Sequence, residues 1–367
     1  MRVRSATVAA AVLALGLGGA WFAWAGGDGG SDACSGPSCV LYVAPTGDDA
    51  ADCSEGAPCL TLDRAYHGAQ PGQTVELAAG RYPDQRLLYD PAKTSAEHVV
   101  FGPAPDAQVF VSDLKIGTDR YTAGASHVTF RDVTFGGWTV EGCGSPGGTA
   151  QCAAGAASGG DDVVFRNVTV RGGVFVNSGT NVSVLGGSIG PGVNYHPDVQ
   201  NSYLMKKRPR NILFDGVLFH DWTRTKKPCD ASGLCHVECL QISSGDYITI
   251  RNSTFRHCDI FDVHMDDGVS WGTGFPTHVT VENNDFGAST DGAGYPTPYA
   301  LSIYGGSHVL VRGNRWAEAP RFPPRKNPAV DFHVVANRGP YDRRACDTRL
   351  RYERNRFAGA RCGPTDR

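Results

Sequence analysis

The sequence predicts an all-β fold of the solenoid type, in which short strands stack in successive coils. Composition supports this prediction, because the 367 residues include 47 Gly and 22 Pro but only 3 Met. No long run after residue 70 has helical periodicity, and a turn-rich chain with many short alternating runs is typical of all-β proteins. A pattern of alternating apolar residues, a polar or Gly turn and a second apolar pair also recurs along the chain.

Eight copies of this pattern follow one another, and each is too small to bury its own apolar face. Neighbouring copies must therefore stack, with equivalent residues in columns about 4.8 Å apart. We expect Asn252, Asn283 and Asn355, which occupy the same turn, to form an internal ladder of stacked amides. The copies begin near residues 127, 162, 181, 211, 247, 278, 308 and 350, from HVTFRDVTF to LRYERNRF.

Residues 42–82 predict a strand, a polar loop, a short amphipathic helix at 61–69, a Pro71-Gly72 turn and a second strand at 74–77. The pattern YVAPTGDD … APCLTLDRAY … PGQTVELAAGRY resembles the N-terminal cap of secreted right-handed parallel β-helix proteins of the pectate-lyase-like superfamily. The resemblance implies a helix that closes the open end of the solenoid and Tyr82 at the end of the first coil strand. It also implies a single right-handed parallel β-helix domain over residues 41–367, and it says little about the reaction.

The N-terminus predicts export. Arg2 and Arg4 precede an apolar run at 6–25, and Ala23-Trp24-Ala25 has the small-x-small form that signal peptidases accept. We therefore expect a signal peptide at 1–25, a flexible tether at 26–40 and a secreted or extracellular monomer. The alternative is an uncleaved membrane anchor, since about 20 apolar residues also span a bilayer.

The 12 cysteines all follow the apolar segment, and an even number in an oxidising compartment favours disulfides. Proximity in sequence is the basis for pairing them locally. The alternative is a metal site built from Cys235, His236, Glu238, Cys239, His257 and Cys258. The expected pairs are Cys34 with Cys39, Cys53 with Cys59, Cys143 with Cys152, Cys229 with Cys235, Cys239 with Cys258, and Cys346 with Cys362.

The stretch 236–268 is the part of the chain richest in His and acidic residues. We aligned five inward-facing apolar pairs, Val174/Val176, Leu240/Ile242, Phe261/Val263, Leu301/Ile303 and Val330/Phe332, as strands of one sheet. This alignment places the outward-facing residues in two columns, which gather carboxylates, imidazoles and a phenol on one face. The first column is Phe175, Gln241, Asp262, Ser302 and Asp331, and the second is Asn177, Ser243, His264, Tyr304 and His333.

Loops at 192–210 and 222–235 are expected to border this face with a basic rim. We expect the rim to hold a polyanionic chain, although a solvated loop is an equally open interpretation. The net charge of −3 argues against a nucleic acid as the partner. The candidate substrate-binding residues are Lys206, Arg208, Gln241, His236, Glu238 and Trp271, with Trp222, Trp271, Tyr295 and Tyr299 as sugar-stacking platforms.

The resemblance implies polysaccharide ligands, and we expect a lyase or epimerase that acts on an acidic, uronate-containing polysaccharide. Elimination needs a group that neutralises the carboxylate, a base for the C5 proton and an acid for the leaving oxygen. His264 or His333 is the expected base and Tyr304 the acid, with Lys206 or Arg208 as the neutralising group and Asp262 and Asp331 orienting the histidines. FDVHMDD at 261–267 partly resembles the Asp-x-His-Asp element of alginate C5-epimerases, but Val263 and Met265 depart from it.

Three other interpretations stay open. An inverting glycoside hydrolase would use paired carboxylates, either Asp262 with Asp331 or Asp266 with Asp267. A non-catalytic carbohydrate-binding or surface solenoid is the alternative from another functional class. A cofactor is not defined by the sequence, although Glu238, Asp266 and Asp267 supply the oxygen ligands that Ca²⁺ prefers.

The first testable prediction concerns processing. The mature protein should begin near Gly26, because Ala23-Trp24-Ala25 ends the apolar run. Intact-mass analysis of the exported protein checks this, and a mass that retains residues 1–25 would contradict it.

Overall fold

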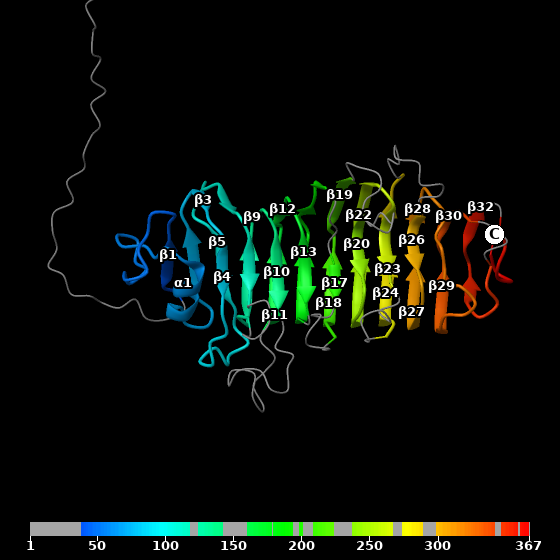
Figure 1. Cartoon of the computed structure of the whole chain (residues 1–367), viewed down its shortest axis with the longest axis horizontal. Coiled ribbons are helices and arrows are strands. Elements are labelled where there is room, and N and C mark those ends of the chain that lie inside the picture. Colours follow the sequence, from blue (N-terminus) through cyan, green and yellow to red (C-terminus); the bar gives the residue numbers. More distant parts are fainter. Residues whose placement is uncertain are drawn as a thin grey trace, which may run out of the picture. The chain divides into compact units, whose positions relative to one another are not determined.

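A computed structural model describes residues 38–117, 124–141, 160–177, 179–193, 198–200, 208–223, 237–266, 274–288, 299–341, 346–358 and 360–366. These residues form a right-handed parallel β-helix with a short capping helix, which confirms the predicted fold class. Successive coils lie side by side from the N-terminal to the C-terminal end (Figure 1). A typical coil runs from the first sheet through the third to the second, as β18, β19 and β20 do before the chain returns to the first sheet at β21.

The first sheet contains 12 parallel strands and forms one long face. Its inward residues are apolar and buried, and Val163, Val182 and Ile212 lie opposite one another in consecutive coils. In order across the sheet the strands are β1 (Val40–Val43), β2 (Thr74–Leu77), β5 (Val99–Pro103), β8 (Val128–Arg131), β11 (Asp161–Arg166), β14 (Thr180–Leu185), β18 (Arg210–Asp215), β21 (Asp246–Arg251), β24 (Thr277–Glu282), β27 (Gly306–Arg312), β29 (Ala329–Val335) and β31 (Arg351–Glu353).

The second sheet contains eight parallel strands and carries most of the predicted site. In chain order its strands are β4 (Gln85–Leu87), β7 (Leu114–Ile116), β10 (Trp138–Glu141), β13 (Val174–Asn177), β17 (Asp198–Gln200), β20 (Glu238–Ile242), β23 (Phe261–Met265) and β26 (Tyr299–Ile303).

The third sheet follows the first around the coil, after a two-residue turn in every coil from β8 onward. Most of its strands are short, since the chain bends again within a few residues. They are β3 (Gly80–Tyr82), β6 (Val109–Val111), β9 (Thr134–Phe135), β12 (Thr169–Val170), β15 (Ser188–Ile189), β16 (Gly192–Val193, paired beside the main path), β19 (Leu218–Thr223), β22 (Thr254–Cys258), β25 (Asp285–Phe286), β28 (Arg315–Trp316), β30 (Arg338–Pro340) and β32 (Arg356–Ala358).

The capping helix α1 (Leu62–Gly68) matches the predicted helix. Thr61 is its N-cap, and its Oγ1 accepts a hydrogen bond of 3.1 Å from the backbone N–H of Arg64. Leu62, Ala65 and Tyr66 are fully buried against the end of the core, and Tyr66 donates a hydrogen bond of 2.9 Å to the Ser126 carbonyl. Apolar core residues are thereby shielded from water at the open end of the solenoid.

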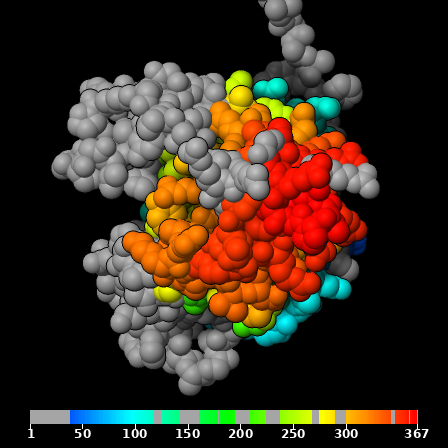
Figure 2. Space-filling model, turned by 90° about the vertical axis from the view of Figure 1, so that its right-hand side faces the viewer, coloured from blue at the N-terminus to red at the C-terminus, as the bar shows by residue number. Residues whose placement is uncertain are grey.

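The predicted repeats correspond to strand pairs of the first and third sheets, from β8 and β9 to β31 and β32. The segment that the sequence analysis assigned to the second sheet, Val330/Phe332, is a further copy of the same pair. It forms β29 and lies between β27 and β31 of the first sheet, so its predicted sheet is wrong. Residues 346–358 and 360–366 follow it at the C-terminal end, which faces the viewer in Figure 2.

Three of the predicted disulfides are confirmed in the described residues: Cys53–Cys59, Cys239–Cys258 and Cys346–Cys362. Cys39 is also disulfide-bonded, while its predicted partner and the other two predicted pairs lie outside the described residues. The Cys239–Cys258 bond removes both thiolates from the alternative metal site around 235–258, so that site is not formed as proposed.

A ladder of buried polar side chains runs through the turn between the first and third sheets. The asparagine Nδ2 atoms of Asn284, Asn314 and Asn337 each donate to the Oδ1 of the next rung at 3.0–3.1 Å and to a backbone carbonyl of the previous coil. Asn355 continues the ladder, and Asp366 ends it by accepting from both Asn355 nitrogens at 2.9 and 3.0 Å.

The prediction of an amide ladder is therefore confirmed for Asn355 and wrong for Asn252 and Asn283. These two residues are exposed and have φ of +52° and +53°, one position before the buried rung. Asn tolerates the left-handed region better than most residues, so it is favoured at the exposed first position of the turn, whereas the buried rung position favours Asn for its amide hydrogen bonds. The residue types in the turn therefore do not show which of the two positions is the buried rung.

No helix in the described part of the chain is long and apolar enough to cross a membrane. The predicted signal peptide at 1–25 and most of the predicted tether lie outside the described residues, so both stay predictions.

The ladder generates a stability prediction. Asn337→Ala should lower the free energy of unfolding by several kcal/mol, because it removes four buried hydrogen bonds, each worth about 0.5–1.5 kcal/mol, and leaves the Asn314 N–H without its acceptor. Asn314 Nδ2 keeps its bond to the Val281 carbonyl, and Asn355 Oδ1 keeps the bond from the backbone N–H of residue 337. Chemical denaturation of the wild type and variant measures the change.

Asn283→Gly is the matched control, since it sits one position before a ladder rung and glycine accepts positive φ. Its effect should stay within about 1 kcal/mol. Equal losses in the two variants would show that the ladder does not stabilise the coil.

Candidate functional site

The outward face of the second sheet contains a polar column that is set by strand register. Gln241 lies opposite His264, and His264 lies opposite Ser302. The sequence alignment placed Asp262 in this column, which is a slip of two residues in β23. A two-residue slip keeps every side chain on its face, so the prediction that Leu240, Ile242, Val263, Leu301 and Ile303 point inward agrees with their complete burial.

Two predicted catalytic residues do not belong to this face. Asp331 and His333 lie in β29 of the first sheet, where His333 is in register with Leu310. Asp331 pairs there with His308 (Nδ1 to Oδ2, 2.9 Å) and with His333 (Nε2 to Oδ1, 2.8 Å). The expectation that all five catalytic candidates share one sheet is therefore wrong.

The coil position that we had assigned to Asp331 is occupied by Arg321. Arg321 forms an isolated parallel bridge with Ser302, in which the Arg321 N–H donates to the Leu301 carbonyl at 2.7 Å and the Ile303 N–H donates to the Arg321 carbonyl at 2.8 Å. The column on the second sheet thus continues as Gln241, His264, Ser302 and Arg321. Arg321 was not predicted from the sequence, because Pro320 and Pro323 lie close to it on either side and no alternating run is present.

His264 and Tyr304 meet edge to face, with ring centroids 5.3 Å apart and an interplanar angle of 89°. The imidazole also stacks on the Phe261 ring, with centroids 4.8 Å apart. Arg321 lies over the Tyr304 ring with its guanidinium carbon 5.2 Å from the centroid, and it also lies over Tyr299 at 5.9 Å. An imidazole, a phenol and a guanidinium are thereby held together by aromatic packing.

The site differs in exposure from one side to the other. His264 is 4% exposed and Ser302 is fully buried, whereas Tyr304 is partly exposed and Arg321 is exposed. The solvent-exposed side of this group is therefore the side of Tyr304 and Arg321.

Asp262 is a buried carboxyl at the corner between the second and third sheets. It is 3% exposed, and its Oδ2 has no hydrogen-bond partner among the described residues. Burial raises the pKa of Asp262 well above its usual value, the negative charge of Glu318 raises it further, and Arg256 opposes the shift. Asp262 therefore keeps its proton to a higher pH than an ordinary aspartate does, which does not suit the predicted role of orienting a histidine as a carboxylate.

Gln241 and Glu238 occupy β20, as predicted, but differ in position. Gln241 is nearly buried and its Nε2 donates to Ser243 Oγ at 3.0 Å and to Asp266 Oδ2 at 3.5 Å. Glu238 is fully buried at the start of the strand, opposite Phe261. Gln241 thus lies beside His264 in the column, whereas Glu238 is the first residue of β20 and lies outside the column.

The predicted basic rim is described only in part. Arg208 is directed to protein groups: its Nε donates to Asp246 Oδ2 at 3.0 Å and its Nη2 donates to the carbonyls of Gly245 and Phe275 at 2.8 Å. It therefore connects loops next to the first sheet. The other predicted contacts Lys206, His236 and Trp271, together with Asp267 and Tyr295, lie outside the described residues.

Two of the predicted sugar platforms are described. Trp222 is fully buried and its Nε1 donates to the Ile189 carbonyl at 3.2 Å, so it is not an exposed platform. Tyr299 is partly exposed and stacks on Phe261 with ring centroids 6.1 Å apart.

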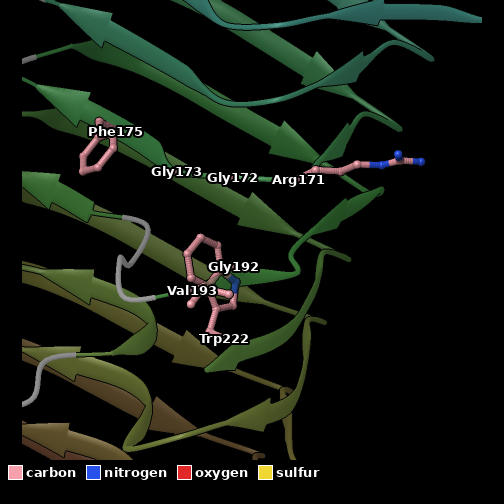
Figure 3. A pocket seen from close by; sticks show the side chains of 7 residues that line it. All are labelled: Arg171, Gly172, Gly173, Phe175, Gly192, Val193 and Trp222. Carbon is pink, nitrogen blue, oxygen red and sulfur yellow. The ribbon is translucent and has the colours of Figure 1, made fainter. Parts of the chain in front are cut away.

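A hollow of about 390 Å³ lies farther along the solenoid, at the corner between the third and second sheets. Figure 3 shows the rings of Phe175 and Trp222 at this hollow, with Arg171 directed away from them. Phe175 belongs to the same column as His264, three coil steps away through β17 and β20, or about 14 Å. The hollow is also lined by Gly172, Gly173, Gly192 and Val193.

A metal-binding arrangement is found elsewhere. Within the described ranges, His98, His127 and Asp162 are the group of three potential ligands whose atoms lie close enough to hold one ion, and they belong to the first sheet. Glu238 and Asp266 are not part of such a group, and Asp267 is outside the described residues, so the calcium hypothesis gains no support from the described side chains.

No protein-family model matches the chain, and no curated protein matches it. Solved structures similar to it include a GH136 lacto-N-biosidase from Eubacterium ramulus, with a TM-score of 0.45 and 12% identity over 87% of this chain and 68% of that one. XylC in complex with xylose has a TM-score of 0.46 and 9% identity over 89% and 85% of the two chains. The adhesin PfbA of Streptococcus pneumoniae has a TM-score of 0.43 and 12% identity over 80% and 86%. These likenesses concern the fold and carry no argument about the reaction.

The state of Asp262 generates a prediction about pH. Its folded pKa exceeds the unfolded value of about 3.9, so the unfolded chain loses this proton first as pH rises and the folded protein becomes less stable from about pH 4 upward. Asp262→Asn removes this contribution. The free energy of unfolding of the variant relative to wild type should therefore increase between about pH 4 and 7.

Asp285→Asn is a control with the opposite sign. Burial raises the pKa of Asp285, but hydrogen bonds from Arg315 and Arg256 outweigh burial and lower it, so this carboxylate stabilises the fold above the unfolded pKa and the stabilisation is lost on acidification. Denaturation curves across this pH range distinguish the two variants. A difference between Asp262→Asn and wild type that stays constant with pH would show that the pKa of Asp262 is not raised in the folded protein.

Proposed function

We propose that the outward face of the second sheet is the active site of a lyase or epimerase that acts on an acidic, uronate-containing polysaccharide. The observation that carries the proposal is that His264 and Arg321 both lie against the phenol ring of Tyr304. The imidazole centroid is 5.3 Å and the guanidinium carbon 5.2 Å from the centroid of that ring. These are the three kinds of group that elimination from a uronate requires.

Each side chain has one role in this proposal. The Arg321 guanidinium binds the uronate carboxylate and neutralises it, so that negative charge can develop as C5 loses its proton. His264 takes the C5 proton, because imidazole titrates near neutral pH. The C5–H electrons form the C4–C5 double bond as the C4–O4 bond breaks, and Tyr304 donates a proton to the leaving O4.

Epimerisation uses the same first step. If the C4–O4 bond does not break, return of a proton to the opposite face of C5 inverts this centre. The Phe175 hollow, about 14 Å along the column, then holds a distant part of the same polymer against an aromatic ring.

Hydrolysis is less well supported by this arrangement. The pair of Asp262 and Asp331 is divided between two sheets, and a hydrolase needs both carboxyl groups at one glycosidic bond. A non-catalytic polysaccharide-binding solenoid is the competing proposal, and it would use the same column without turnover.

The test is turnover on a panel of uronate polymers, followed by ultraviolet absorbance of the unsaturated product and by exchange of the C5 hydrogen with solvent. Absorbance identifies a lyase, and exchange without absorbance identifies an epimerase. We expect His264→Gln and Tyr304→Phe to lower turnover by about 10²–10⁴-fold with polymer binding retained. Arg321→Gln should mainly weaken binding of uronate polymers relative to neutral ones.

His67→Gln, on the exposed surface of the capping helix, is the matched control and should keep full turnover. Polymer binding without turnover by wild type on the whole panel would favour the binding solenoid. Unchanged turnover in folded His264→Gln would remove His264 from the mechanism.

A further inference from the structure

A column of mostly polar residues runs along the first sheet, one position before the first inward side chain of each coil. Strand register aligns these residues, and those from His127 onward have φ between +51° and +58°. His, Asp and Asn tolerate this left-handed conformation better than most residues do. The column comprises His98, His127, Asp162, Asn181, Asn211, Tyr247, His278, His308 and Asp331.

The first three members converge on one point. His98 Nε2 and His127 Nδ1 each lie 2.9 Å from the same oxygen, Asp162 Oδ2, and the three ligand atoms all lie within 4.8 Å of one another. The residues come from three successive coils, immediately before or within β5, β8 and β11 in the N-terminal half (Figure 1).

The surroundings of the trio orient one imidazole and shield all three side chains in part. Thr129 Oγ1 lies 2.8 Å from His98 Nδ1, and a hydrogen bond there directs Nε2 toward Asp162. Side-chain exposures are 18% for His98, 23% for His127 and 34% for Asp162, so the site has protein on one side and solvent on the other. Burial raises the pKa of Asp162, but hydrogen bonds from His127 and His98 outweigh it and lower the pKa, which keeps the carboxylate ionised.

The same order of residue types, two histidines and an aspartate, occurs again at the other end of the column as His278, His308 and Asp331. These three side chains do not converge on one point. The two imidazoles stack there, with centroids 4.5 Å apart and planes at 17°, whereas the rings of His98 and His127 are 6.2 Å apart and inclined by 64°. Only His308 of that pair contacts Asp331, and His278 stacks on Tyr247 instead. Convergence therefore does not follow from the column alone.

We propose that His98, His127 and Asp162 form a binding site for a divalent transition-metal ion, for which Zn²⁺ is the best fit. Two imidazoles and one carboxylate are a typical set of three protein ligands for Zn²⁺, with water in the fourth position. Ligand bonds of about 2.0–2.2 Å place tetrahedral ligand atoms about 3.3–3.6 Å apart, so each nitrogen would move about half an ångström from the carboxylate oxygen. The two nitrogens, which lie within 4.8 Å of each other, would settle at the same separation. The two nitrogens release any proton they hold when they bind the ion.

Such an ion would connect three successive coils in the N-terminal half of the solenoid. The site lies on a different sheet from His264 and is independent of the proposed reaction. Zinc binding should therefore raise the melting temperature whether or not a polysaccharide substrate is found.

The experiment uses the untagged full chain, stripped with a chelator, dialysed and titrated with ZnCl₂ at neutral pH. Equilibrium dialysis with metal analysis gives the stoichiometry, and thermal unfolding gives the stabilisation. We expect wild type to bind one more Zn²⁺ than His127→Gln or Asp162→Asn, and its melting temperature to rise by several degrees. Thr129→Val, which keeps a β-branched side chain, should bind the ion about 10–100-fold more weakly, as loss of a supporting hydrogen bond does in other zinc sites.

His278→Gln and Asp331→Asn are the matched controls, since they change the same residue types at the same coil position in the trio that does not converge. Both should retain the wild-type zinc stoichiometry. Absence of zinc binding by wild type, or equal stoichiometry in wild type, His127→Gln and Asp162→Asn with all three folded by circular dichroism, would overturn the proposal and leave a hydrogen-bonded trio.

Discussion

Backbone hydrogen bonding between successive parallel coils is the constraint on which the other features depend. Because each strand pairs in register with the next, residues far apart in sequence come to lie about 4.8 Å apart, and any chemistry on the surface must be arranged in columns. Gln241, His264, Ser302 and Arg321 form one such column across four coils. The same rule aligns His98 with His127 and Asp162 on another sheet.

The period of the strands was the most predictable feature of the sequence. Side chains alternate with period two, so Leu240, Val263 and Leu301 could be assigned to the interior even though the alignment of β23 was wrong by two residues. The identity of the opposing residue was less predictable, since loops of different length separate the strands. His264 was therefore assigned to the correct face but to the wrong column.

The assignment of Asp331 and His333 failed for a related reason. Apolar alternation in 330–334 is equally compatible with any of the three sheets. The prediction used this alternation alone and did not consider Asn337, which follows the strand. In the structure that asparagine is a ladder rung, and rungs occur only after strands of the first sheet in the described coils. Arg321 was not predicted because Pro-Arg-Phe-Pro has no strand-like pattern. A single bridge between Arg321 and Ser302 is nevertheless enough to continue the column.

Because of the polar ladder, the earlier and the later coils of the solenoid are not interchangeable. Val133, Val168 and Val217 fill the rung position in three of the earlier coils, whereas Asn284, Asn314 and Asn337 fill it in later coils. A coil duplicated within its own half meets neighbours with matching bonding groups, but a valine coil moved between two asparagine coils would interrupt a one-way chain of donors. Growth of this solenoid by repeat duplication is thus restricted to compatible neighbours. The carboxylate of Asp366 accepts hydrogen bonds from Asn355 but has no N–H to donate to a further rung, so the asparagine series stops there.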